Sequence, residues 1–225
     1  MTREARGLGH VTQARRQFRV AAVLFFVLGA AASAVMFFCA GPLAELMNDS
    51  LAYYPIKVLS PAVFFVCLIG CFRGYTQGRG NMVPTAASQV LEATFKLFIG
   101  LGLAWYVLNT LSVSVEIGAA AAIFGVTVGS AAAALFLITW LLRHRLSSRS
   151  GEQAQRAGPI LKKLLLIGVP ITLGSSVMSI ITLVDQTVVM ARLQNGLGLA
   201  EQAAAALYGQ YTFGMTLFNL SATFV

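Results

Sequence analysis

Five polar side chains in an otherwise apolar segment share one helical face. Thr85, Ser88, Gln89, Glu92 and Lys96 recur at i, i+3, i+4, i+7 and i+11, the spacing of one side of an α-helix. Glu92 precedes Lys96 by four residues, the favourable order for an ion pair. In a membrane helix each ionisable side chain costs at least about 2.5–3.5 kcal/mol and so needs a reason. Two interpretations stay open: a pair that neutralises itself between packed helices, and the lining of a water-filled cavity.

A second candidate acid, Asp185, follows an uncharged run from Leu164 to Val184. It could bind a coupling proton or a monovalent cation, or pair with a basic group of another helix. It could equally lie near the outer membrane interface, because Arg192 follows within two helical turns. The sequence alone leaves a coupling site and an interface position both open.

A cationic, glycine-rich helix end precedes the polar stripe. It consists of Arg73, Gly74, Tyr75, Gln77, Gly78 and Gly80. One interpretation is an inside-facing cap and turn, whose arginine reaches phosphate headgroups. The other brings Arg73 against an anionic substrate group such as a pyrophosphate. Composition alone favours the first.

The composition identifies the elements that must hold these residues. Of the 225 residues, 57% are hydrophobic and 11% charged, and the mean hydropathy is +0.77. Soluble domains carry about 25% charged residues. A soluble two-layer enzyme, a disordered tail and a disulfide-stapled module are therefore excluded. The chain is predicted to be all-α, a polytopic bundle of membrane-spanning helices.

Runs of about 20 apolar residues predict about six spans. They cover residues 20–43, 52–75, 84–108, 117–142, 161–193 and a last helix that starts near Glu201. The fifth is too long for one straight span, so we expect it to be tilted or broken near Pro170 and Gly174. Gly125 and Gly129 predict tight packing of the fourth helix.

Charge distribution orients these spans. The net charge is +8, and only three of the sixteen basic residues lie outside residues 1–19, the glycine-rich break at 73–83 and the loop 143–163. This clustering is typical of the positive-inside bias and argues against nucleic-acid binding. We expect a multi-pass protein of the cell membrane with both ends cytoplasmic. Residues 1–19 are predicted to be a cytoplasmic loop that enters a helix, not a signal peptide.

The same pattern predicts three parts. Residues 1–142 form four spans after a cytoplasmic loop, residues 143–163 a basic inter-bundle loop, and residues 164–225 two spans of a second bundle. Because the last helix is still apolar at Val225, we expect a segment of a longer polytopic protein.

The sequence lacks the motifs of a membrane-embedded enzyme or an ATPase. No G-x-x-x-x-G-K-[ST], H-E-x-x-H or G-x-S-x-G motif occurs. Cys39, Cys67 and Cys71 lie in apolar runs without a neighbouring histidine, so free thiols are favoured over a metal site. We predict no enzyme activity, no cofactor, no metal and no ATP binding.

Residues 59–96 carry a family resemblance. The segment LSPAVFFVCLIGCFRGYTQGRGNMVPTAASQVLEATFK resembles the stage V sporulation protein B-like branch of the polysaccharide flippases, in the multidrug/oligosaccharidyl-lipid/polysaccharide exporter superfamily. The run KKLLLIGVPITLGSSVMSIITLVDQTVVMARLQ is similar to the first helix of that branch's second bundle, and ALYGQYTFGMTLFNL looks like the next helix. The chain departs from the family where Asn219-Leu220-Ser221 stands in place of Asn-Leu-Pro.

The resemblance implies a fourteen-helix transporter of two bundles that works by alternating access, with this chain covering about its third to eighth helices. Arg73 would meet phosphate, and Gln77, Ser88, Gln89, Glu92 and Lys96 would line the cavity. Asp185 would couple to a proton or monovalent cation, or to closure between bundles. The family's arginines in its first helix are outside this chain.

We therefore predict a flippase for a lipid-linked oligosaccharide, such as a peptidoglycan precursor or another polysaccharide intermediate. A role in sporulation is implied only by the resemblance. Two alternatives remain: a cation-coupled multidrug exporter of the same superfamily, and a non-transporting membrane scaffold for wall synthesis or sporulation.

Overall fold

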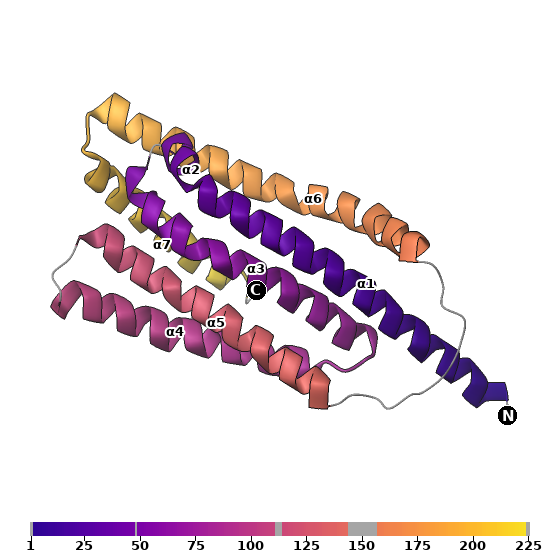
Figure 1. Cartoon of the computed structure of the whole chain (residues 1–225). Helices are drawn as coiled ribbons and strands as arrows, with labels where there is room; N and C mark the ends of the chain where they lie inside the picture. The colour runs from indigo at the N-terminus through magenta and orange to yellow at the C-terminus, as the bar shows by residue number, and fades with distance from the viewer. Residues whose placement is uncertain (1, 48, 111–113, 144–156, 224–225) are drawn as a thin grey trace. The chain divides into compact units, whose positions relative to one another are not determined.

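The computed structural model describes residues 2–47, 49–110, 114–143 and 157–223 of the chain. All regular elements in these ranges are helical, which confirms the predicted all-α class (Figure 1). In chain order the elements are α1 (Thr2–Phe38), α2 (Ala40–Leu46), the 3₁₀ turn η1 (Ser50–Ala52), α3 (Tyr53–Gly78), α4 (Val83–Thr110), α5 (Val115–Arg143), α6 (Ala157–Ala191), the π-helical turn η2 (Arg192–Gly196) and α7 (Glu201–Thr223).

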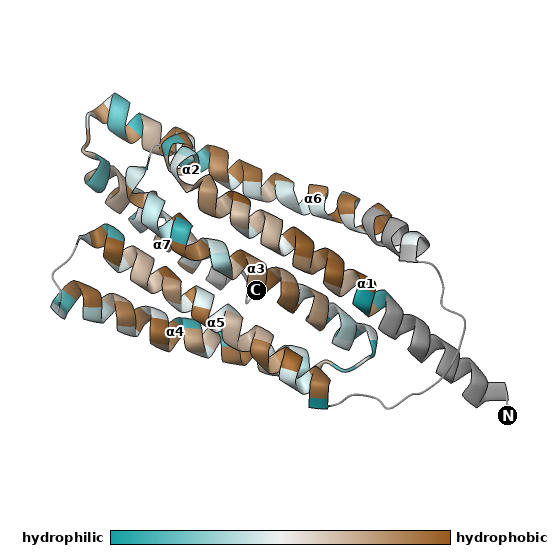
Figure 2. Ribbon diagram, viewed as in Figure 1, coloured by the Kyte–Doolittle hydropathy of each residue, from teal (hydrophilic) through white to brown (hydrophobic). Residues whose placement is uncertain are grey.

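Five stretches of the described helices are long and apolar enough to cross a membrane. They are Gln17–Phe38, Ser50–Gly78, Val83–Thr110, Val115–Arg143 and Leu166–Gly196. Figure 2 shows hydrophobic residues along most of each of these helices. The sixth predicted helix is present as α7, but Gln202, Gln210 and Asn219 reduce its hydropathy. The chain is a multi-pass membrane protein, as the composition predicts.

Two sequence-based expectations about the helices need correction. The segment before the first span was predicted to be a loop but is helical, because α1 already begins at Thr2, and its position in the cytoplasm stays a prediction. Alanine, arginine and glutamine, all good helix formers, are frequent in this stretch. Of the two expectations for the long fifth helix, a break near Pro170 and Gly174 is wrong, since α6 continues through both residues, and a tilt stays a prediction. Membrane helices tolerate such residues when neighbouring groups satisfy the freed backbone.

The described residues form two compact units, each considered by itself. The first unit comprises Met1–Phe38 and Tyr54–Val169. Its buried core lies where α3 meets α5, and α1 approaches α3 closely at Gly29, whose added Cβ would lie 2.9 Å from the Cβ of Cys67. The core residues are Ile69, Ala133, Ala134 and Leu137, with Phe65, Phe72 and Phe136 packed against them.

Helices α4 and α5 pack at very short range through small residues. A Cβ added at Gly100 would lie 2.8 Å from the carbonyl oxygen of Ala122, and one added at Gly125 would collide with the backbone of Gly100. These glycines let the two backbones meet directly, which confirms the tight packing predicted from Gly125 and Gly129.

A glycine-dependent turn joins α3 to α4. The N–H of Asn81 donates to the carbonyl of Thr76 at 3.1 Å, and the N–H of Gly80 donates to that of Gln77 at 2.8 Å. Gly80 has a φ of 75°, the left-handed conformation that this hydrogen-bond pattern requires. The Oδ1 of Asn81 then accepts from the N–H of Val83, where α4 begins. The turn therefore returns the chain antiparallel to itself within a few residues.

The second unit comprises Cys39–Tyr53 and Pro170–Val225. Its buried apolar side chains are Ala40, Ala44, Met190 and Ala204, each at most 3% exposed. The predicted division at residues 143–163 stays a prediction, since residues 144–156 lie outside the described ranges.

Candidate functional site

The α3–α4 hairpin brings together four of the residues singled out from the sequence. Arg73 lies seven residues before Gly80 in the turn, and Ser88 lies eight residues after it. An antiparallel return over such equal distances sets the two residues opposite one another. Glu92 and Lys96 follow Ser88 at successive turns of α4, on the same face.

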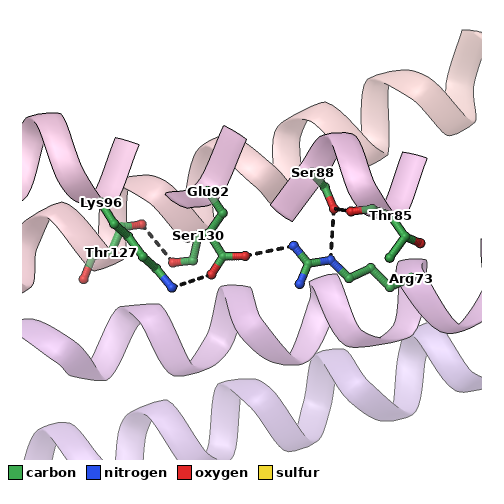
Figure 3. A network of polar contacts seen from close by, with 7 residues as sticks. All are labelled: Arg73, Thr85, Ser88, Glu92, Lys96, Thr127 and Ser130. Carbon is green, nitrogen blue, oxygen red and sulfur yellow. Dashed lines mark hydrogen bonds and ion pairs between the residues drawn. The ribbon is translucent and has the colours of Figure 1, made fainter. Parts of the chain in front are cut away.

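The four side chains form a continuous charged network, drawn in Figure 3. The Nε of Arg73 donates to the Oγ of Ser88 at 2.9 Å. The Nη2 of Arg73 lies 2.8 Å from Oε2 of Glu92, and the Nζ of Lys96 lies 2.7 Å from Oε1. Each carboxylate oxygen of Glu92 therefore binds a different cation.

Exposure differs along this network. The side chain of Glu92 is 12% exposed, that of Arg73 is 19% exposed and that of Lys96 is 38% exposed. Two cations and one anion leave a formal excess of one positive charge. Within the described part of the chain, Nη1 of Arg73 has no hydrogen-bond partner, so donors remain for another anion.

Buried hydroxyl groups hold the arginine end of the network. Ser88 donates to the carbonyl of Thr85 at 2.8 Å while it accepts from Arg73. Thr76 donates to the carbonyl of Arg73 at 3.0 Å, and its Oγ1 lies 3.1 Å from that of Thr85. Because Thr76, Thr85 and Ser88 are all buried, these bonds fix the last turns of α3 against the first turns of α4.

Helix α5 supports the acidic end of the network from behind. A Cβ at Gly129 would lie 2.8 Å from the carbonyl oxygen of Glu92 and 3.0 Å from Cγ of Lys96. The absence of a side chain at Gly129 thus lets α5 sit directly against the turn that carries both charged residues. Thr127 also ties α5 to α3, since its Oγ1 donates to the carbonyl of Val58 at 3.0 Å.

Three predicted residues lie outside the network. Gln77 on α3 and Gln89 on α4 are exposed, and within the described residues neither side chain makes a hydrogen bond. Asp185 lies in α6 of the second unit, where its side chain is exposed and contacts no charged group of the described chain. The roles predicted for these three residues stay predictions.

Two parts of this arrangement were not predicted from the sequence. The ion pair of Glu92 with Lys96 was expected, but the second ion pair of Glu92, with Arg73, was not. The near-equal spacing of Arg73 and Ser88 about Gly80 is the signal that could have revealed the pairing. The other part is the buried Thr76, which looks like an ordinary residue of an apolar helix in the sequence.

Among the described residues, no three His, Cys, Asp or Glu side chains lie close enough to hold a metal ion. Cys39, Cys67 and Cys71 are free thiols.

Comparison with known proteins identifies relatives over nearly the whole chain. The family described as "Polysaccharide biosynthesis protein" matches residues 14–225. The "Uncharacterized membrane protein YabM" of Bacillus subtilis is 30% identical over 209 residues, 92% of this chain and 39% of that protein. The "Stage V sporulation protein B" of the same organism is 28% identical over 195 residues, 82% of this chain and 36% of that protein.

The chain spans less than two fifths of the length of either relative. No solved structure gives a significant match.

Proposed function

Because the chain belongs to the polysaccharide biosynthesis protein family, we propose that it is part of a flippase for a lipid-linked cell-wall or polysaccharide precursor. The observation that carries the proposal is the network of Arg73, Glu92 and Lys96. It holds two cations and one anion among helices whose composition is otherwise apolar. Intramembrane charges are costly and mark the pathways of charged substrates.

The unequal charge supports an anionic headgroup as the ligand. A phosphate or pyrophosphate would compete with the carboxylate of Glu92 for Arg73 and Lys96, because both cations bind phosphate oxygens well. Lys96 is the most exposed of the three and would meet the anion first. The exposed amides of Gln77 and Gln89, with Ser88 and the released Glu92, would hydrogen-bond sugar or peptide groups.

The apolar face of α4 supports a lipid tail that stays in the bilayer. Val90, Leu97 and Phe98 are 68%, 54% and 71% exposed, on the side of the helix away from the network. Such a surface suits contact with acyl or polyprenyl chains. The headgroup would cross through a polar path that opens first inward and then outward, while the tail turns within the membrane.

Transport by this route needs an energy source other than ATP bound to this chain. Asp185 is the acid we assign to coupling, by a proton or a monovalent cation or by closure between two bundles. Its exposed position on a membrane-spanning helix supports an exchangeable ligand more than a permanent ion pair. We place both ends of this segment in the cytoplasm, on the distribution of basic residues.

The test uses the full-length protein in liposomes that contain a labelled polyprenyl-diphosphate sugar. We expect Glu92→Gln, Lys96→Ala and Arg73→Ala to slow translocation by about tenfold or more, the equivalent of about 1.4 kcal/mol. Thr94→Val is the matched control on α4, because Thr94 is exposed and its Oγ1 bonds only the carbonyl of Val90. Unchanged translocation in the Glu92 and Arg73 variants would remove their assignment.

Cells lacking the protein separate the alternatives. A flippase defect leaves the lipid-linked precursor in the inner leaflet, whereas loss of a drug exporter changes toxin resistance and leaves the precursor unaffected. A scaffold would tolerate Gln89 and Glu92 substitutions and keep its partners.

A further inference from the structure

A polar contact in the second unit links two segments that are 151 residues apart in the chain. Ser50 begins η1, and Glu201 is the first residue of α7. The Oγ of Ser50 donates to Oε2 of Glu201 at 2.9 Å, and the backbone N–H of Ser50 donates to Oε1. The carboxylate of Glu201 therefore accepts hydrogen bonds from both donors of Ser50. Two bonds fix the orientation of the two residues as well as the distance between them.

The segment that carries Ser50 is connected in an unusual way. Cys39–Tyr53 joins α1 to α3, both of which belong to the first unit, yet it lies in the same compact unit as Pro170–Val225. Ala40 and Ala44, one turn apart on α2, are buried, and so is Ala204 in the first turns of α7. The segment thus has a buried apolar face in addition to its hydrogen bonds with Glu201.

This contact lies at the opposite end of α3 from the charged network. Ser50 precedes the first turn of α3, whereas Arg73 lies near its last turns. Of the sixteen basic residues, only Lys57 and Arg192 lie near the connections at the Ser50 end, while thirteen lie in residues 1–19, 73–83 and 143–163. By the positive-inside bias, the Ser50 end faces outward.

We propose that Ser50 and Glu201 form an outer latch, which holds the Cys39–Tyr53 segment on α7 while the transport path is closed to the outside. This inference rests on the alternating access of the proposed function. The bond holds the segment on α7 only while it lasts, so its loss frees the connection between α1 and α3. The contact is exposed, so its donors and acceptors can exchange partners and the latch can open without leaving buried groups unpaired.

The test is a reversible cross-link in the full-length protein. All native cysteines are first replaced, and Ser50→Cys is combined with Glu201→Cys. We expect oxidation to form a disulfide in membranes, to stop translocation of the labelled precursor, and a reductant to restore it. The single variants Ser50→Cys and Glu201→Cys are the controls for oxidation and for loss of the hydrogen bonds.

Cross-link yield also tests the latch without any transport assay. If the latch opens during the cycle, adding a polyprenyl-diphosphate sugar to equilibrated membranes changes the initial rate of disulfide formation. A protein that moves no precursor but still shows this change overturns the proposed substrate transport and keeps the latch. Translocation at the unlinked rate in the cross-linked protein overturns the latch, as does failure of the disulfide to form.

If the double variant does not fold, Glu201→Gln replaces it. The amide keeps one acceptor oxygen and loses the other. We therefore expect a membrane-impermeant thiol reagent to label a cysteine at the buried position of Ala44 faster, in an Ala44→Cys variant without the native cysteines. An unchanged labelling rate contradicts the proposal.

Discussion

The charged network and the contact of Ser50 with Glu201 differ in almost every physical respect. The network of Arg73, Glu92 and Lys96 is partly buried, and its members lie within a single hairpin. The contact of Ser50 with Glu201 is exposed and joins segments 151 residues apart. The network needs all its members, because loss of one partner leaves an uncompensated charge in a weakly solvated environment. The exposed contact can lose a partner to water at little cost.

This difference suits two separate tasks. A partly buried network with several ion pairs suits the proposed binding site, which must keep its shape and release its carboxylate only to another anion. An exposed two-point contact suits an element that must open and close in every cycle. Substitutions in the network should therefore cost more stability than substitutions in the latch.

Removal of Glu92 should have the largest effect. Glu92→Ala leaves Arg73 and Lys96 facing each other without an anion. This costs about 3 kcal/mol, the lower end of the range for buried unpaired charges, because the two cations are 19% and 38% exposed. We expect a loss of this size in the free energy of unfolding, measured by denaturant titration in detergent. If the loss is below that of Thr94→Val on the same helix, the network is not a structural unit.

The second largest loss of stability is expected from disturbing the packing of α5 against the network. In Gly129→Ala the new Cβ would lie 2.8 Å from the carbonyl of Glu92, so α5 must move away from the charged turn. Forced overpacking of this sort costs about 1–3 kcal/mol. Gly102→Ala on α4 is the control, because nothing lies within 4 Å of its added Cβ. Equal stability of the two variants would contradict the close approach of α5.

The pattern of residues predicted the network better than it predicted the latch, and the reason is physical. The stripe on α4 obeys helical periodicity, so Ser88, Glu92 and Lys96 are expected on one face, and the ion pair of Glu92 with Lys96 forms as its spacing indicates. Pairing with Arg73 depends on the length of the turn at Gly80. The local sequence determines turn geometry only in part.

Three other features were not predicted from the sequence. Gln89 follows Ser88 by one residue, and this 100° rotation is enough to leave it exposed while Ser88 is fully buried. The contact between Ser50 and Glu201 depends on tertiary packing across most of the chain, for which neither residue type carries a local signal. The helix over residues 2–19 was missed because its arginines were interpreted as a topology signal alone.

The latch should respond weakly to loss of one hydroxyl group. Ser50→Ala removes the bond from Oγ but keeps the one from the backbone N–H to Glu201. A single hydrogen bond contributes about 0.5–1.5 kcal/mol, and an exposed one lies near the lower end. We expect a small rise in the labelling rate of the Ala44→Cys thiol and no measurable change in the free energy of unfolding. A loss as large as that in Glu92→Ala would abolish the contrast between the two contacts.

The smallest expected effect is a dependence of the docking of the Cys39–Tyr53 segment on pH. Asp49 lies beside Ser50, outside the membrane-spanning stretches, and its Oδ1 is buried without a hydrogen-bond partner among the described residues. Burial, and then the nearby charge of Glu201, raise the pKa of the Asp49 carboxyl above its ordinary value of 3.8, while the N–H groups of Leu51 and Ala52 partly oppose the shift. Protonation of Asp49 therefore favours the docked segment.

The sign of the effect follows from this raised pKa. Asp49 contributes most to docking at pH values below the ordinary 3.8, and that contribution is lost as the pH rises through the raised pKa. In the variant with Ser50→Cys and Glu201→Cys the carboxylate of Glu201 is absent, so the measurement uses labelling of Ala44→Cys with both latch residues intact. We expect labelling, corrected for the thiolate fraction with a free cysteine, to increase with pH across this window.

Asp49→Asn is the control, because it cannot ionise and should hold the low-pH rate throughout. Parallel profiles for the wild-type protein and Asp49→Asn would show that Asp49 has no part in docking, and would leave the hydrogen bonds of Ser50 as the whole of the latch.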